Sequence, residues 1–74
     1  MSIRKKFGRR VIALRQERNW TQEELAALSG ISTRSVSNIE NGVFSVTLDT
    51  AEKLARSFSI PLATLFDFED DGRL

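Results

Sequence analysis

The segment from Thr21 to Gly42 constrains the fold most, because it carries the start and stop signals of two short helices. Thr21 is followed three residues later by Glu24, the spacing of a capping box in which each side chain accepts a hydrogen bond from the other residue's backbone N–H group. This spacing predicts a helix that begins at Gln22. Gly30 can adopt the positive φ that ends a helix without a Cβ clash, so we expect this helix to stop there.

A second helix is predicted directly after the glycine turn. Ser32 is a suitable N-cap, and Val36 and Ile39 are three residues apart, on one face with Ile31 just before the helix. The opposite face carries side chains that can hydrogen-bond to base edges, namely Thr33, Arg34, Ser37 and Asn38. Two short helices joined by a tight turn are the layout of a DNA-reading helix-turn-helix.

The ordered set of residues in this segment resembles the phage-repressor and Cro-like helix-turn-helix family, which includes small bacterial and plasmid regulators and restriction-modification controller proteins. The matching residues are Thr21, Gln22, Leu25, Ala26, Gly30, Val36, Ile39, Glu40, Asn41 and Gly42. The resemblance covers nearly the whole chain. It implies a lambda-repressor-like domain that binds double-stranded DNA and regulates transcription.

Apolar spacing outside the motif predicts three further helices. Phe7, Val11 and Leu14 form one stripe of a first helix over residues 3–18, and Trp20 after it is expected to plug the core rather than to stack on a ligand. A fourth helix follows a Thr47 cap and ends near residue 59, and a short fifth helix has Pro61 in its first turn. The fold class is therefore all-α, a compact five-helix bundle in one domain over residues 1–74, with the motif at 21–42, C-terminal helices within 47–68 and an acidic tail at 69–74.

The resemblance also implies roles for individual residues. Base reading falls to Thr33, Arg34, Ser37 and Asn38, with Arg34 the strongest candidate because a guanidinium can pair with guanine through two hydrogen bonds. Phosphate contacts fall to Gln22, Ser35 and Asn41, and a structural ion pair falls to Arg15 and Glu40. For the hydroxyl residues, ordinary polar filling of an exposed face remains an alternative. The loop after Gly42 departs from the family, since it has Val43 and Phe44 where many relatives carry Lys or Arg. Phe44 is left open between the core, DNA and an interface.

Charge is unevenly distributed along the chain, although the net charge is only +1. Residues 1–18 hold seven Lys or Arg residues and one Glu, whereas residues 48–74 hold three basic and six acidic residues. Because phosphate attracts one end and repels the other, this asymmetry favours an oriented approach to nucleic acid. The alternative is that the basic run is only a solvated helix face.

Composition excludes several classes of site. With no cysteine and no histidine, the chain cannot form disulfides, thiolate metal sites or an imidazole catalytic centre. No paired-carboxylate or activated-nucleophile motif is present, so we expect no enzyme activity, no cofactor and no metal. The apolar run over residues 11–14 is too short for a signal peptide, and we expect a cytoplasmic protein without a membrane or small-molecule partner.

The C-terminal segment has more apolar residues than a short helix can easily bury, which predicts a homodimer. The residues expected at the interface are Ile60, Leu62, Leu65, Phe66 and Phe68. A dimer would bind a roughly palindromic operator, with RNA polymerase as a further partner. One alternative is a monomer whose core these residues cap, and another is an antitoxin-like module that covers a different protein.

Overall fold

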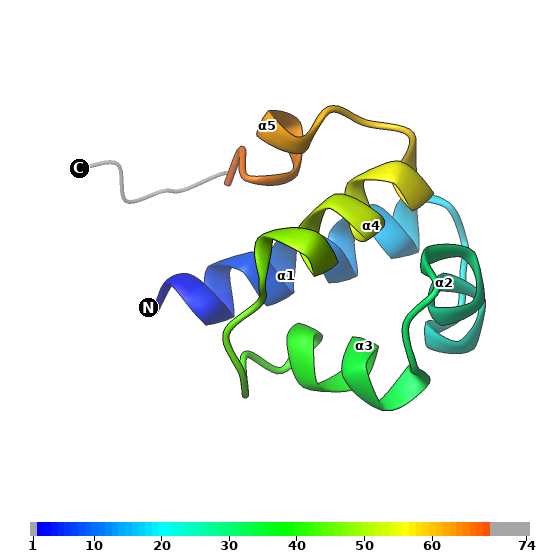
Figure 1. Ribbon diagram of the computed structural model, residues 1–74, viewed down its shortest axis with the longest axis horizontal. Helices are drawn as coiled ribbons and strands as arrows, with labels where there is room; N and C mark the ends of the chain where they lie inside the picture. Colours follow the sequence, from blue (N-terminus) through cyan, green and yellow to red (C-terminus); the bar gives the residue numbers. More distant parts are fainter. Residues whose placement is uncertain (1, 69–74) are drawn as a thin grey trace.

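Capping side chains begin four of the five helices, and three of these caps, Thr21, Ser32 and Thr47, were predicted from the sequence. The computed structural model describes residues 2–68 and has the helices α1 (Ile3–Glu17), α2 (Gln22–Ser29), α3 (Thr33–Glu40), α4 (Leu48–Phe58) and α5 (Leu62–Leu65), as Figure 1 shows. The N-caps are Ser2, Thr21, Ser32 and Thr47, and each accepts a hydrogen bond from a backbone N–H three residues later. No strand occurs over residues 2–68, so the predicted all-α class is confirmed.

The helix boundaries follow the predictions closely, with two small corrections. Thr21 and Glu24 form the predicted capping box, and Gly30 ends α2 at a φ of 77°. Arg18 is the C-cap of α1 rather than its last residue. Pro61 lies just before α5 as its N-cap rather than in its first turn, since its extended backbone, with a ψ of 151°, is not helical. The predicted acidic tail at 69–74 lies outside the described residues.

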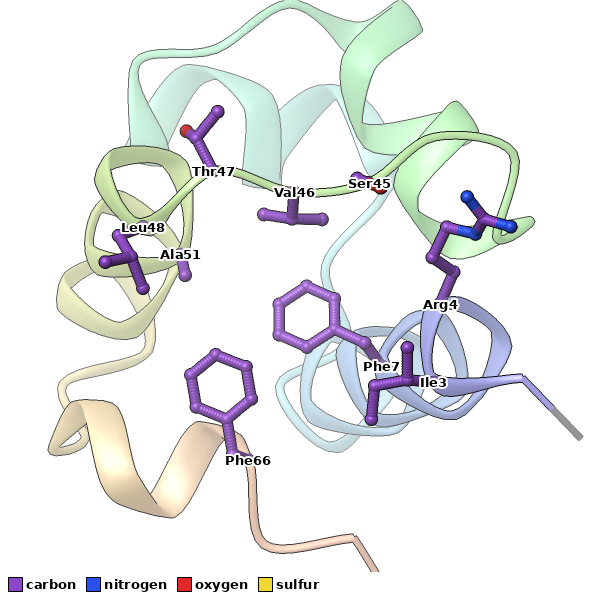
Figure 2. Close-up of a pocket in the computed structure, with 9 residues that line it drawn as sticks. All are labelled: Ile3, Arg4, Phe7, Ser45, Val46, Thr47, Leu48, Ala51 and Phe66. Atoms are coloured by element: carbon purple, nitrogen blue, oxygen red, sulfur yellow. The ribbon is translucent and has the colours of Figure 1, made fainter.

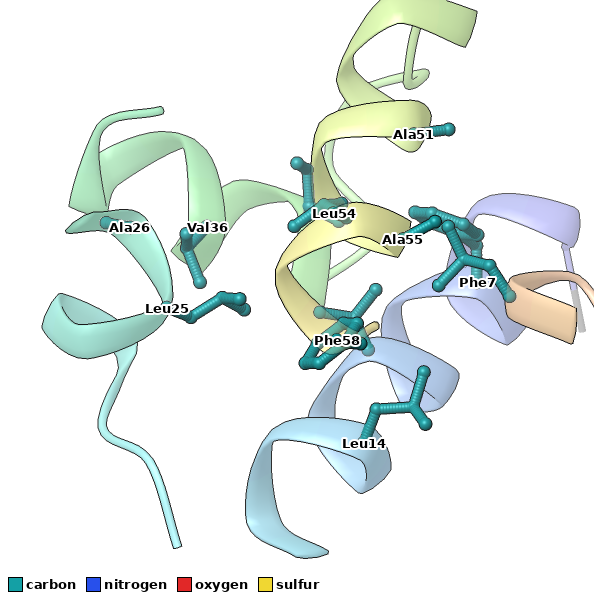
Figure 3. Close-up of a cluster of buried hydrophobic side chains, with 12 residues drawn as sticks. Phe7, Leu14, Leu25, Ala26, Val36, Ala51, Leu54, Ala55 and Phe58 are labelled. Carbon is teal, nitrogen blue, oxygen red and sulfur yellow. The ribbon is translucent and has the colours of Figure 1, made fainter. Parts of the chain in front are cut away.

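The hydrophobic core lies between α1, the α2–α3 pair and α4, and Figure 3 shows side chains from all four helices pointing into it. Its fully buried side chains are Val11, Leu25, Val36, Leu54, Phe58 and Leu65. Trp20 packs against this core with its ring stacked on Phe58 at 5.8 Å between centroids, so the prediction of a core plug is confirmed.

The structure corrects the prediction that Leu65 lies at the dimer interface. Its side chain has no exposed surface, because α5 folds back and inserts it into the core, so within the folded monomer it cannot contribute to the expected dimer interface. The neighbouring Phe66 remains 41% exposed. Leu65 is the last residue of α5 and lies in the core, whereas Phe66 is the C-cap that follows the helix and lies at the surface.

Gly8 permits a close contact between the backbones of α1 and α3. A Cβ built on Gly8 would lie 2.5 Å from the backbone carbonyl oxygens of both Ile39 and Glu40. The last turn of α3 therefore rests directly on the backbone of α1. Only a residue without a side chain allows this approach, which sets the position of α3 relative to the rest of the domain.

We expect Gly8→Ala to destabilise the fold by about 1–3 kcal/mol, the usual result of overpacking. In an exposed helix the same change would stabilise by about 1 kcal/mol, because alanine has the higher helix propensity. The sign of the effect therefore tests the contact. Urea unfolding followed by circular dichroism measures it, with Arg9→Ala at the exposed neighbouring position as the control. A higher unfolding midpoint for Gly8→Ala would show that the two helices are not in tight contact.

Candidate nucleic-acid interface

The third helix presents a polar face to solvent while its apolar face is held in the core. Val36 and Ile39 are buried, whereas Thr33 and Arg34 are exposed. The two other predicted base-reading residues, Ser37 and Asn38, are half-buried. In Figure 1, α3 runs along one edge of the molecule and α5 lies at the opposite edge. The structure thus brings the four predicted base-reading residues onto one helix at an accessible edge.

The residues predicted to contact phosphate flank this face. Ser35 is half-buried in the first turn of α3, where its hydroxyl oxygen accepts a hydrogen bond from the Ser32 hydroxyl at 2.9 Å. Asn41 is exposed at the C-cap of α3. Gln22 lies at the start of α2, and its side-chain amide donates to Glu40 Oε1 at 2.9 Å. Gln22 therefore has a structural contact that the sequence did not suggest.

Glu40 joins the ends of three helices. Arg15 donates from Nε to Glu40 Oε2 at 2.7 Å and from Nη2 to Glu40 Oε1 at 3.1 Å, so the predicted ion pair is present and has two hydrogen bonds. The remaining terminal nitrogen of Arg15 donates to the carbonyl of Trp20 at 2.8 Å. With Gln22 as a further donor, the carboxylate of α3 is bound to both α1 and α2.

The Arg15–Glu40 pair is shielded from water, since the two side chains are 15% and 3% exposed. The hydrogen bonds with Glu40 are the main cause that raises the pKa of Arg15 above its ordinary value, although burial opposes them. A cation whose pKa is raised on folding stabilises the fold at every pH below its unfolded pKa. The Arg15 guanidinium therefore stays charged throughout the range in which the protein would work.

Two other basic residues of the N-terminal run have structural contacts. Arg18 donates to the carbonyl of Phe58 at 2.9 Å, and its guanidinium lies over the Phe58 ring at 5.0 Å. Arg10 donates to the carbonyl of Thr64 at 2.9 Å and so ties α5 to α1. The exposed cations of α1 are Arg4, Lys5 and Arg9. The sequence did not reveal this division, because it depends on carbonyl groups 40 or more residues away along the chain.

The predicted dimer residues differ in their exposure. Leu62 is 37% exposed and Phe66 is 41% exposed, whereas Ile60 and Phe68 are half-buried and pack against the core. Phe66 also contacts the ring of Phe7 at 5.4 Å between centroids. The exposed part of the expected interface is therefore centred on Leu62 and Phe66.

An apolar hollow of about 250 Å³ lies between the start of α1, the start of α4 and the end of α5. Figure 2 shows Phe7, Phe66 and Val46 converging on it, with Arg4 at its rim. Its full lining is Ile3, Arg4, Phe7, Ser45, Val46, Thr47, Leu48, Ala51 and Phe66. The hollow has no cluster of polar groups that would orient a small polar ligand.

No group of three or more acidic residues over positions 2–68 is arranged to hold a metal ion. Across the same positions, none of the helices has both the length and the apolar character that a membrane span requires.

Comparison with known proteins agrees with this geometry. Residues 11–65 match the helix-turn-helix family model, and the chain belongs to this family. It is 33% identical to the control protein C.BamHI of Bacillus amyloliquefaciens over 96% of this chain and 89% of that protein. It is 45% identical to the transcriptional repressor RghR of Bacillus subtilis over 74% of this chain and 42% of the repressor, so it spans less than half the length of that relative.

Solved structures show the same fold. The restriction-modification controller protein C.AhdI of Aeromonas hydrophila superposes with a TM-score of 0.81 at 37% identity, over 84% of this chain and 94% of that one. The fold class, the helix-turn-helix and the membership of a DNA-binding family of transcriptional regulators are thus confirmed.

We expect Glu40→Ala to destabilise the fold by about 3 kcal/mol, because it leaves Arg15 without its partner in a largely buried position. Glu17→Ala is the matched control, since Glu17 pairs with Arg18 at 3.6 Å on the surface and its loss should cost only about 0–1 kcal/mol. Thermal unfolding of Glu40→Ala, Arg15→Ala and the double variant measures the coupling. Strictly additive single effects would contradict a direct interaction.

Proposed function

We propose that this protein is a sequence-specific transcriptional regulator that binds a roughly palindromic operator in double-stranded DNA as a homodimer. The proposal rests mainly on one observation, that α3 packs its apolar face in the core and leaves its polar face accessible. Arg34 and Thr33 are exposed on that face, while the Glu40 network fixes its C-terminal end. A rigid helix with exposed hydrogen-bonding side chains is what direct readout in the major groove requires.

Base reading is assigned to the polar face and positioning to its flanks. Thr33, Arg34, Ser37 and Asn38 would contact base edges, with Arg34 directed at guanine. Gln22, Ser35 and Asn41 would contact phosphate groups, which set the position of α3 without reading sequence. Gln22 has an additional part in this scheme, because its amide also holds Glu40.

Dimerisation would occur through the surface around Leu62 and Phe66, bordered by the half-buried side chains of Ile60 and Phe68. Leu62 belongs to α5, which lies at the edge of the molecule opposite α3 (Figure 1). A two-fold axis near α5 would separate the two recognition helices by about 34–36 Å, so that each enters a successive major groove. The working compartment would be the cytoplasm, and RNA polymerase is a protein partner that such a regulator can contact at a promoter.

We expect Arg34→Ala to weaken operator binding by about 1–3 kcal/mol and to relax preference at one base position in each half-site. Selection of bound sequences from a random DNA pool, followed by titration, measures both effects. Arg56→Ala provides a matched control, because Arg56 is also an exposed arginine but lies on α4. An unchanged consensus for Arg34→Ala would overturn the base-reading assignment.

We expect Leu62→Asp to give a folded monomer that binds a two-half-site operator weakly, because a charge would be placed in the interface. Leu28→Asp on α2 is the control, since Leu28 is 57% exposed and lies outside this surface. Sedimentation gives the mass and circular dichroism the folding. A wild-type protein that stays monomeric at tens of micromolar and fills half-sites independently would contradict the dimer.

A further inference from the structure

The short helix α5 carries the exposed part of the predicted dimer surface, and contacts with distant residues hold it in place. It has only four residues and no side-chain hydrogen bond at its N-terminal end. A helix of this length is not stable by itself in water. Leu65 anchors it in the core, and the ring of Phe66 lies 5.4 Å from that of Phe7 between centroids. Arg10 of α1 adds a hydrogen bond from Nη2 to the carbonyl of Thr64 at 2.9 Å.

The carbonyl of Thr64 lies within the predicted dimer surface. Thr64 is two residues after Leu62 and two residues before Phe66, the exposed apolar residues of this surface. Its carbonyl also accepts a hydrogen bond from the backbone N–H of Asp67 at 3.1 Å. Loss of the bond from Arg10 would therefore affect the placement of the dimer surface without leaving the carbonyl unpaired.

Arg10 holds α5 at a cost in stability. Its side chain is half-buried, and its Nε–H group is buried without a hydrogen-bond acceptor among residues 2–68. A buried donor without an acceptor destabilises a fold, and an aliphatic side chain of similar length would occupy this place without that cost. An aliphatic side chain cannot supply a directional bond to α5. The distinctive contribution of Arg10 is therefore the orientation of α5.

The helix that carries Arg10 also holds the proposed reading helix. α1 contacts α3 through Gly8, which lies against the last turn of α3, and through Arg15, whose guanidinium binds Glu40. Arg10 lies between Gly8 and Arg15 in the sequence. In Figure 1, α1 lies between α3 and α5. One rigid helix thus connects the reading helix to the dimer surface.

We propose that Arg10 is a positioning residue that determines which half-site spacing a dimer accepts, because it fixes the direction of α5 relative to α3. This inference rests on the proposed function, since it needs two copies of the chain on one operator. One base pair more or less between the half-sites displaces the second half-site by about 3.4 Å and rotates it by about 35° around the duplex. A dimer joined through α5 follows this change only if α5 turns on its own domain, which breaks the bond from Arg10.

A phosphate contact is a weaker explanation for Arg10. Its guanidinium donates to α5, and α5 lies at the edge of the molecule opposite α3 (Figure 1). The neighbouring Arg9 is exposed, whereas Arg10 is half-buried. These positions suit Arg9 for a charged contact with phosphate and Arg10 for a contact within the domain.

The test compares operators at the preferred half-site spacing with operators one base pair longer or shorter. In the wild type, a changed spacing should lower the affinity about tenfold, the effect of one hydrogen bond from a charged donor. Arg10→Met has already lost this bond, so its preference for the best spacing should be about tenfold smaller. Its affinity for a single half-site and its urea unfolding midpoint should stay close to the wild-type values, because α3 is unchanged and the unpaired Nε–H is removed as well.

Two further variants separate orientation from charge. Arg10→Lys keeps a donor near the Thr64 carbonyl and should retain most of the preference for one spacing. Arg9→Met is the matched control, since it removes an exposed cation from the adjacent residue and any loss of affinity should be equal at every spacing. Arg10→Gln, whose side chain is shorter than arginine but still polar, replaces Arg10→Met where the latter does not fold. Sedimentation shows whether each variant is still a dimer.

The outcomes separate this inference from the proposed function. An unchanged spacing preference in folded, dimeric Arg10→Met would overturn the role of Arg10 and leave the proposed function standing. A variant that sediments as a monomer would assign Arg10 to the strength of the dimer rather than to its geometry, and equal losses at single half-sites and at all spacings would assign it to DNA contact. Either result would overturn the inference. A wild-type protein without any preference for spacing would contradict both the dimer and the role of Arg10.

Discussion

The carboxylate of Glu40 is the contact on which the position of α3, the proposed recognition helix, depends. α3 has only eight residues, and a helix of that length is not stable by itself in water, so its orientation must come from contacts with the rest of the domain. Glu40 supplies them in two ways at once. Its side chain binds Arg15 of α1 and Gln22 of α2, and its backbone carbonyl lies against Gly8. The exposed side chains of α3 are thereby presented from a fixed base.

A buried carboxylate is costly to remove from water, and Arg15 offsets this cost for Glu40. Two further arginines of the N-terminal run bind backbone carbonyls instead, Arg18 at the end of α4 and Arg10 next to α5. Part of the positive charge of residues 1–18 therefore serves contacts within the domain. Of the basic residues of α1, Arg4, Lys5 and Arg9 are exposed and can attract phosphate at long range. The count of basic residues in the sequence therefore overestimates this attraction.

Most of the fold could be predicted from local signals, whereas the contacts between distant segments could not. The capping box at Thr21 and the turn at Gly30 depend on neighbouring residues, so the sequence placed them correctly. The Arg15–Glu40 pair was predicted only through family resemblance. The need for glycine at position 8 arises from α3, which is some 30 residues away, and no local pattern contains it. Leu65 was misplaced for a similar reason, because apolar spacing in a four-residue helix does not determine which side faces the core.

If α3 reads DNA as proposed, the chemistry around it favours recognition by shape and hydrogen bonding over attraction by charge. Arg34 is the only cation on this helix, and the loop that follows it carries Val43 and Phe44 without a basic residue. Neutral contacts are short-ranged and directional, so they contribute only when the helix is correctly placed. A reading surface of this kind needs a more rigid support than a strongly basic one does. The close contact at Gly8 and the multiple hydrogen bonds at Glu40 would provide that rigidity, so in the proposed function the packing of this small domain would support its discrimination between DNA sequences.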